Sequence, residues 1–336
     1  MKLSIAIIIS LTSCDAFTPT NINQHHVVTS SSSTTSLNQF GTLGFDTNSL
    51  YTREEEEIIK KQNEIMAYLA DSQLPNTVLR STLGTSVMIS GFDPEDPSST
   101  EILAFLNNED SPHFPFTKIV AHVEDTKLAK KRLIGRNARY TGLLDKLNFS
   151  EGAALPTVDQ LDDVSSWVAH VGGGDMSKVA DIADVAEKAE SVKNVAILVS
   201  GATSVGGDAL KEAEEVLKSK ATTFSYTLLV VPEWNDEPEA SCAFGIVNAT
   251  DVTDAPFGES ESFSREESLR IITECLTLEK AAGKCVIANA AKDTKSLDHM
   301  LIQGMREIGF TRLAEIEHMV TMGAKVCYTF LLILNL

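Results

Sequence analysis

The sequence predicts an α/β protein with a doubly wound parallel sheet and helices on both faces. Short apolar, often β-branched runs alternate with amphipathic segments of about 10 to 15 residues over most of the chain. Several of these runs end directly in glycine or a polar residue. Such alternation favours a parallel sheet built from βαβ units. The 336 residues suffice for one large domain of this kind with appendages.

The individual elements follow from the positions of the apolar runs and the helix-capping residues. We expect strands over residues 85–90, 118–123, 166–171, 194–199, 226–231 and 285–290. We expect helices over residues 100–107, 127–133, 176–190, 208–218, 264–278 and most of 294–322. Ser98 with Glu101, and Ser264 with Glu267, have the spacing of capping boxes. Residues 148–164 are ambiguous, with a poor strand at 153–155.

An acidic helical extension, residues 46–80, precedes the sheet domain, which we place at 81–325. Thr52 is suited to cap a helix whose first turn holds three glutamates, and these favour the positive end of the helix dipole. A one-sided apolar stripe reaches Leu74, and Pro75 ends the helix. The stripe is expected to pack on the following domain; a partner-binding helix is the alternative.

The first 45 residues have the composition of targeting segments. Residues 1–16 combine Lys2, a short apolar run and small residues up to Ala16, as in a cleavable secretory signal peptide. Phe17 opens a Ser/Thr-rich tract, 17–45, that contains no Asp, Glu, Lys or Arg. Together they resemble the bipartite plastid presequence of diatoms and related algae, which implies a plastid (chloroplast) location. Secretion with a glycosylated Ser/Thr-rich stalk is the alternative.

The last eleven residues, 326–336, read VCYTFLLILNL and do not continue the alternation of strands and helices. Val326 and Cys327 could be encoded by a splice-donor sequence, so we interpret this apolar tail as read-through of an intron. A final buried strand or a short membrane-seeking tail are the alternatives. A transcript sequenced across the Lys325 codon decides between them, because continuous coding would end the intron interpretation.

Charge and cysteine content exclude several classes of function. The formal net charge of -19 argues against a nucleic-acid partner and against docking on an anionic membrane surface. The five cysteines form no CxxC pair, so neither a disulfide framework nor a structural zinc site is expected. His122 and His170 lie in predicted strands and are interpreted as core or face residues, and no metal site is predicted.

Two glycine-containing turns compete as the cofactor turn. The strand at 194–199 leads into Gly201, Gly206 and Gly207 and then a helix, which could be the first crossover of a dinucleotide-binding fold. In that register Glu233 would be the acid that binds the ribose. In the other register the strand at 85–90 comes first, because two βα units precede residue 194, and the turn is residues 91–100.

The chain from 85 to 290 resembles the atypical short-chain dehydrogenase/reductase group of NAD(P)-binding Rossmann proteins. KIVAHVEDTKLAKKRL (118–133) is similar to the group's second strand and following helix, and AEKAESVKNVAILVSGA (186–202) to its fifth strand. EAEEVLKSKATTFSYTLLVVPEWNDEP (212–238) is similar to its sixth strand, and FSREESLRIITECL (263–276) to a later helical segment. The resemblance implies a Rossmann-like sheet, NAD or NADP as cofactor, and the turn at 91–100 as its site.

The turn departs from the GxxGxxG pattern that the resemblance implies. Only Gly91 is present, and it is followed by Phe92, three acids at 93, 95 and 96, and two prolines. Side chains then occupy the space of a phosphate, prolines remove amide donors, and carboxylates repel the phosphate charge. Glu124 stands where many relatives place an arginine for the NADP phosphate. It could bind an NAD ribose, but we interpret it as a solvated strand end.

The catalytic residues that the resemblance implies have few counterparts in this chain. No tyrosine has a lysine four residues on, as the wider superfamily's dyad requires. Ser200, Thr203 and Lys211 are the remaining candidates, although capping and turn formation explain the hydroxyls equally well. Gly172, Gly173 and Gly174 stand where relatives pass under the cofactor, so a reduced site could persist.

These features predict a plastid protein with a degenerate cofactor turn and weakened NAD or NADP binding. It would be a non-catalytic scaffold, assembly or regulatory protein with a protein partner. The alternative is an active NAD(P)-dependent oxidoreductase with unusual cofactor contacts. A nucleotide sensor without turnover is the third possibility.

Overall fold

The computed structural model describes residues 58–61, 63, 77–107, 114–135, 142–238, 243–249, 252, 256–258, 261–291, 297–307 and 311–322. All of these lie in one compact unit, Tyr51–Leu336. The predicted signal peptide, the transit-like tract and the apolar tail lie outside the described residues. Of the predicted acidic helix, residues 58–61 and 63 are described, and they are helical.

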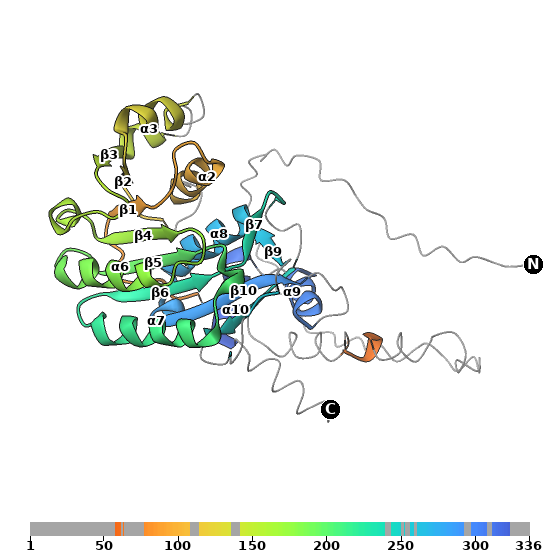
Figure 1. The fold of residues 1–336 in the computed structure, drawn as a ribbon. Coiled ribbons are helices and arrows are strands. Elements are labelled where there is room, and N and C mark those ends of the chain that lie inside the picture. Colours follow the sequence, from red (N-terminus) through yellow and green to blue (C-terminus); the bar gives the residue numbers. More distant parts are fainter. Residues whose placement is uncertain are drawn as a thin grey trace, which may run out of the picture. The chain divides into compact units, whose positions relative to one another are not determined.

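The core of the fold is an eight-stranded sheet (Figure 1). In spatial order its strands are β3 (Leu147–Glu151), β2 (Lys118–Val123), β1 (Ser86–Ser90), β4 (Ser166–Val171), β5 (Asn194–Val199), β6 (Ser225–Val230), β10 (Lys284–Ala291) and β8 (Ala243–Asn248). The α-helices whose bounds lie within the described residues are α2 (Pro97–Leu106), α3 (Thr126–Leu133), α5 (Leu143–Lys146), α6 (Ser177–Lys188), α7 (Gly207–Lys220), α8 (Arg265–Thr277), α9 (Leu297–Glu307) and α10 (Arg312–Met322). Only β8 runs antiparallel to its neighbour, β10.

Each face of the sheet carries its own core, because successive strand residues point to opposite sides. Val87 and Val168 face a core that includes apolar residues of α2, α8, α9 and α10. Met88 and Trp167 face a second core shared with α6 and α7. Strands buried on both faces read as continuous apolar runs, which is why they could be recognised in the sequence.

The six predicted strands are confirmed, and their ends differ from the prediction by at most one residue. The predicted helices are also present, and the last expected segment contains α9 and α10. Ser264 caps α8 as expected, since its side chain accepts a hydrogen bond from the Glu267 amide at 3.1 Å. The prediction of a doubly wound, mostly parallel sheet is therefore correct.

Two local predictions are wrong. The strand expected at 153–155 lies earlier, at β3, an edge strand whose half-exposed residues give no continuous apolar run. The capping box of Ser98 and Glu101 does not form, because α2 begins at Pro97 and its N-cap is Asp96. Glu101 instead forms an ion pair with Arg265 at the start of α8, at 2.9 Å.

Three strands were not predicted. β8 extends the sheet beyond β10, and β7 (Glu233–Asn235) pairs with β9 (Ser262–Ser264) in a separate two-stranded ribbon. β7 and β9 have three residues each, too few to show a period of two. β7 follows β6 closely and places Trp234 near the carboxyl ends of the central strands, where it contacts His170.

The chain joins the sheet domain before residue 81. Leu79 forms an isolated antiparallel bridge with Leu278, and the Arg80 amide donates to the Thr277 carbonyl at 2.8 Å. The Arg80 side chain is buried, with 3% of its surface exposed. Its guanidinium donates to Leu278 O at 2.9 Å, Cys275 O at 3.0 Å and Thr227 Oγ1 at 2.7 Å. It therefore connects the C-terminal end of α8 to the start of β6.

Burial lowers the pKa of Arg80 to about 10, and the neighbouring Cys275 and Glu279 oppose this shift. The side chain is thus still protonated at neutral pH. A cation at a helix C-terminus also complements the helix dipole.

We predict that Arg80→Met destabilises the full chain by about 2–4 kcal/mol, because it leaves buried carbonyls without a donor. Arg132→Met is the matched control. Arg132 is half exposed and pairs with Glu95, so its loss should cost less than about 1 kcal/mol. Urea unfolding measures both values, and equal costs for the two variants would contradict the role assigned to Arg80.

Candidate functional site

The strand order identifies the part of the sheet where a ligand would bind. β1 lies between β2 and β4. The chain continues from β1 to β2 and β3 on one side of it, and then crosses to β4 on the other side. In open α/β sheets, ligands bind at such a switch point, outside the carboxyl ends of the strands. The turn from Gly91 to Asp96 stands there. The rival register, with the turn at Gly201 first and Glu233 as the ribose acid, is wrong, because β5 lies between β4 and β6.

Gly91 makes the closest contact of this turn. Its φ is +81°, and a Cβ atom at this position would lie 2.0 Å from the carbonyl oxygen of His170. Glycine is therefore required by both conformation and space. Its role is to bring the β1 turn against the end of β4 rather than against a ligand.

The amides of Glu95, Asp96, Ser98 and Ser99 are already engaged. The Glu95 amide donates to Asp93 Oδ1 at 2.8 Å and the Asp96 amide to the Asp93 carbonyl at 3.0 Å. The Ser98 amide donates to Asp96 Oδ1 at 2.7 Å and the Ser99 amide to the Asp96 carbonyl at 3.2 Å. Pro94 and Pro97 carry no amide hydrogen. These six positions offer no free donor to a pyrophosphate.

The start of α2 carries a negative charge of its own. Burial acts to raise the pKa of Asp96, but the hydrogen bonds from Ser98 and the charge of Arg265 outweigh it and lower that pKa. Asp96 is therefore ionised and occupies the positive end of the helix dipole, where a phosphate would otherwise bind.

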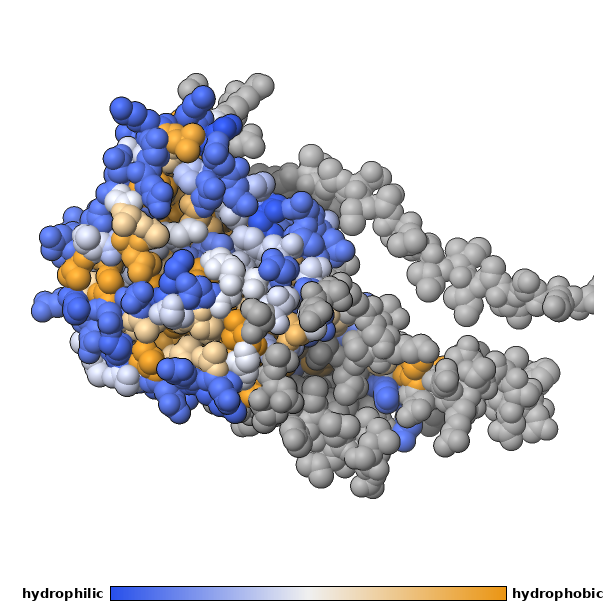
Figure 2. Space-filling view, in the orientation of Figure 1, coloured by the Kyte–Doolittle hydropathy of each residue, from blue (hydrophilic) through white to orange (hydrophobic). Residues whose placement is uncertain are grey.

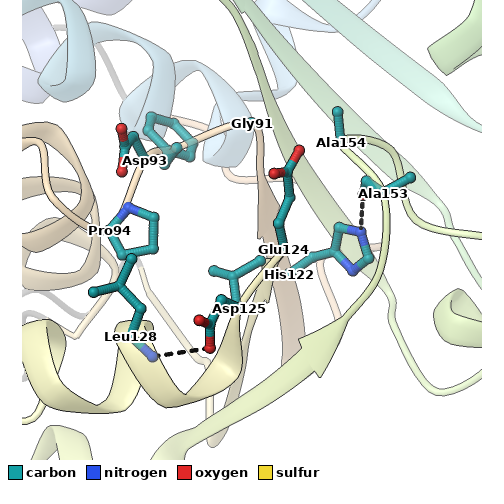
Figure 3. A pocket seen from close by; sticks show the side chains of 11 residues that line it. Gly91, Asp93, Pro94, His122, Glu124, Asp125, Leu128, Ala153 and Ala154 are labelled. Carbon is teal, nitrogen blue, oxygen red and sulfur yellow. Dashed lines mark hydrogen bonds between the residues drawn. The ribbon is translucent and has the colours of Figure 1, made fainter.

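A cavity of about 350 Å³ opens on one side of the turn, at the ends of β1, β2 and β3 (Figure 3). Its apolar wall consists of Phe92, Pro94, Val123, Leu128, Ala153 and Ala154. Gly91, Asp93, His122, Glu124 and Asp125 complete the lining. Three carboxylates and no lysine or arginine line this cavity.

The three carboxylates that line the cavity differ in their hydrogen bonds. Asp93 accepts the Glu95 amide, and Asp125 caps α3 by accepting the amides of Lys127 at 2.8 Å and Leu128 at 3.1 Å. Glu124 is exposed and makes no hydrogen bond or ion pair within the described part of the chain. In Figure 3 it extends into the space between Gly91 and the two alanines.

His122 holds the far wall of the cavity. It is buried, and its Nε2 lies 2.6 Å from the carbonyl oxygen of Ala153 while its Nδ1 lies 3.3 Å from Ser150 Oγ. A carbonyl can only accept, so Nε2 carries the proton. The interpretation of His122 as a buried strand residue is confirmed, and it also fixes the loop after β3.

The other side of the turn is filled by three stacked rings. The His170 ring lies between Phe92, at a centroid distance of 5.1 Å, and Trp234, at 4.6 Å and an interplanar angle of 10°. Its Nδ1 lies 3.0 Å from the Gly91 carbonyl oxygen and its Nε2 lies 2.9 Å from Ser200 Oγ. Nδ1 therefore donates to the carbonyl, and Nε2 accepts from the Ser200 hydroxyl. We call Phe92, His170 and Trp234 the aromatic stack.

The predicted site residues fall into two groups. Gly91, Phe92 and Glu124 line the cavity. Gly172 and Gly173 are exposed at the end of β4, and the Gly174 amide donates to the Ser200 carbonyl at 2.8 Å. The first group lies at the cavity, at the ends of β1 and β2. The second group lies at the end of β4, next to His170 of the aromatic stack.

The catalytic candidates do not form a reactive set. Ser200 is buried and bonded to His170, and Thr203 lies in the short 3-10 turn Ala202–Ser204. Lys211 lies in α7 and makes no hydrogen bond or ion pair within the described residues. Tyr226, the one tyrosine in the described ranges, lies in β6, and burial raises its pKa to about 12. The described residues also contain no cluster of three metal-binding side chains.

Sequence reasoning missed the aromatic stack and the cavity wall. His170 could not be distinguished from an ordinary strand residue, because its partners come from β1, β5 and β7. The acids at 93, 95 and 96 and the prolines were a usable signal for the crowded turn. Nothing in the sequence indicated that Ala153 and Ala154 line a cavity, because small residues are common in loops of every kind.

The fold and the turn at its switch point define a Rossmann-like α/β protein. No protein-family profile matches the sequence, and no curated protein matches it. Solved structures with a similar backbone include a Rossmann-fold NAD(P)-binding family protein from Shigella flexneri. It is 15% identical, the alignment covers 62% of this chain and 94% of that one, and the TM-score is 0.44.

A proposed NAD-dependent epimerase/dehydratase from Bacillus halodurans is 16% identical, covering 66% of this chain and 100% of that one, with a TM-score of 0.43. A proposed NADH-flavin reductase from Streptococcus pneumoniae is 11% identical, covering 62% and 100%, with a TM-score of 0.34. These values describe a shared backbone arrangement and carry no argument about chemistry. Separately, no helix in the described ranges combines the length and apolarity needed to cross a membrane.

We predict that the aromatic stack makes stability depend on pH. Burial lowers the pKa of His170, while its bond to Gly91 and the charge of Asp96 oppose the shift. The unfolded chain, with a histidine pKa of about 6.5, then binds more protons than the folded chain as the pH falls. The stabilisation is complete above about pH 6.5 and is lost progressively below it.

His170→Phe keeps a ring in the stack and removes the titrating group. Unfolding free energies measured between pH 8 and pH 5 should fall more for the wild type than for this variant. Because His318 also has a pKa lowered by burial, the difference between the two proteins is the relevant quantity. Identical pH dependence in both proteins would contradict a lowered pKa at His170.

Proposed function

We propose that the chain is a plastid Rossmann-fold protein that has lost hydride transfer and works as a scaffold, assembly or regulatory subunit. The observation that carries this proposal is the closed turn after β1. The amides of residues 95, 96, 98 and 99 bond within the turn, and Asp93 and Asp96 take the place of phosphate charge. A dinucleotide must cross this turn to lie along the strand ends.

The aromatic stack supports the same proposal from the other side of the switch point. His170 is fixed by Gly91, Ser200 and two rings, so opening a space there would break all four contacts. A nicotinamide ring would need this region if a ligand in the cavity continued across the turn. The alternative, an oxidoreductase with unusual contacts, rests on the sheet and on the cavity, which both remain. A nucleotide sensor rests on the cavity alone.

Charge and surface composition bear on the kind of partner. Figure 2 shows hydrophilic residues over α3 and separate hydrophobic areas elsewhere on that face. Among the described large hydrophobic residues, only Ile59 and Val78 are exposed. The overall negative charge argues against nucleic acid and anionic membranes as partners.

We predict that neither NADH nor NADPH at millimolar concentration raises the thermal unfolding midpoint of the full chain, because a ligand bound to the folded state must raise it. Asp93→Asn with Asp96→Asn is the matched variant. It keeps the acceptor side chains and removes two charges, so any shift should be larger in the variant. A rise of several degrees in the wild type, or oxidation of NADH with an added carbonyl substrate, would contradict the proposal.

The plastid location is a proposal that rests on residues 1–45. We predict that these residues, fused to a fluorescent protein in a diatom, direct it into the plastid. Replacing the Ser/Thr-rich tract 17–45 with a neutral linker should leave the reporter in the secretory route. Secretion of the intact fusion would contradict the plastid assignment and favour the glycosylated stalk.

A further inference from the structure

We propose that one exposed side of α3 docks an acidic segment of a partner protein. Lys127, Lys130 and Lys131 form this side, and we call them the lysine face. The inference names the kind of partner for the proposed scaffold and therefore rests on that proposal. The lysine face is separate from the cavity, because none of its three residues lines the cavity.

Helical spacing brings the three lysines together. Lys130 and Lys131 stand three and four residues after Lys127, so all three are neighbours on the helix surface. They are exposed, whereas Ala129 and Leu133 are buried and pack the other side of α3 against the core. Figure 2 shows the resulting hydrophilic surface over α3.

The lysine face carries no compensating charge, although acids outnumber bases 47 to 28 in the chain. None of its ammonium groups forms an ion pair or hydrogen bond within the described residues. Lys218 of α7, by contrast, pairs with Glu214 one turn away at 2.7 Å. Like charges at this spacing destabilise a helix. An acidic partner would therefore relieve a repulsion as well as add an attraction.

The acids nearest to α3 are used by the helix itself. Asp125 caps its first amides, and Glu151 accepts a hydrogen bond from Thr126 Oγ1 at 2.6 Å. Arg132, the fourth base of the helix, pairs with Glu95 at 2.6 Å. The lysine face is therefore the part of α3 whose charge is available to a partner.

Phe149 of the edge strand β3 adds an apolar contact beside the charges. Its ring is half-buried, and Lys130 Nζ lies 5.8 Å from the ring centroid. This cation–π contact restricts the lysine side chain, which reduces the entropy lost when a partner binds. A segment with several carboxylates and an apolar residue among them matches this surface.

The charge of the whole chain favours a short protein segment over a larger polyanion. Exposed charges are screened beyond about 8 Å at physiological ionic strength, so a short segment on α3 responds mainly to the lysine face. A nucleic acid or an anionic membrane would also approach other surfaces of a chain whose net charge is -19. An acidic protein segment avoids that repulsion.

The experiment is an NMR titration of the full chain with a blocked hexaglutamate peptide at low salt. The amide signals of residues 127–133 and of Phe149 should shift, and hexaglutamine should shift none of them. Binding should weaken as salt rises, because screening reduces the attraction between exposed charges. No shift with hexaglutamate, or shifts confined to other parts of the chain, would overturn the proposal.

The combined variant Lys127→Gln, Lys130→Gln and Lys131→Gln tests the lysine face. It should bind hexaglutamate about tenfold more weakly, because three surface ion pairs are lost. Its thermal unfolding midpoint, measured alongside, shows that the variant is folded. Unchanged affinity in the folded variant would overturn the assignment to α3.

The matched control is the combined variant Lys188→Gln, Lys193→Gln and Lys211→Gln. These lysines lie in α6, before β5 and in α7, and their replacement changes the net charge by the same amount. The control should bind hexaglutamate like the wild type. Equal weakening in both combined variants would overturn the proposal, because net charge alone would then explain binding.

Two further probes test the class of partner, a single-stranded RNA hexanucleotide and vesicles of phosphatidylglycerol. Tighter binding of either than of hexaglutamate would overturn the choice of a protein partner. Absence of hexaglutamate binding would defeat this inference but leave the scaffold proposal standing, whereas NADH or NADPH binding or turnover would defeat the scaffold proposal.

Discussion

The close approach of Gly91 to His170 is the constraint on which the rest of the site depends. With no side chain and a positive φ, Gly91 lets the end of β1 lie directly against the end of β4. Its carbonyl then fixes His170, His170 holds the Ser200 hydroxyl, and the imidazole ring supports Phe92 and Trp234. The close approach at Gly91 therefore packs protein against protein.

This contact divides the switch point into two unequal parts. On the side of β4, β5 and β7, aromatic rings occupy the space, and the half-buried His170 has a lowered pKa. On the side of β1, β2 and β3, a cavity remains that is lined by apolar side chains and three carboxylates. Between them lies a turn with two prolines, in which the amides of Glu95 and Asp96 bond internally. These features are the basis of the proposal that the chain does not bind a dinucleotide at this turn.

The sequence was most informative where burial imposes a pattern. The central strands were located to within one residue because both of their faces are covered, and Ser264 was recognised because capping depends on neighbouring residues. β3, β7 and β8 were not located from the sequence, because they are edge strands or very short strands. Arg80 escaped because its partners lie far away in the chain, at Cys275, Thr227 and Leu278.

In the candidate site, too, residues marked by their position after a strand could be predicted, whereas contacts between distant segments could not. Gly91, Phe92 and Glu124 could be proposed because each follows a strand directly, and the acids of the turn indicated its crowding before any coordinates. The ring of His170 could not be placed, because the sequence around a strand histidine carries no sign of its four partners from other strands and loops. Ser200, Thr203 and Lys211 were catalytic candidates because of their positions after a strand. In the structure the Ser200 hydroxyl donates to His170, and Lys211 makes no hydrogen bond or ion pair within the described residues.

A crystal structure of the full chain grown with millimolar NAD or NADP tests the central claim most directly. The account predicts that the amides of Glu95, Asp96, Ser98 and Ser99 keep their internal hydrogen bonds and that His170 remains between Phe92 and Trp234, with no pyrophosphate at the start of α2. A dinucleotide seated against that turn, with the aromatic stack opened, would contradict it.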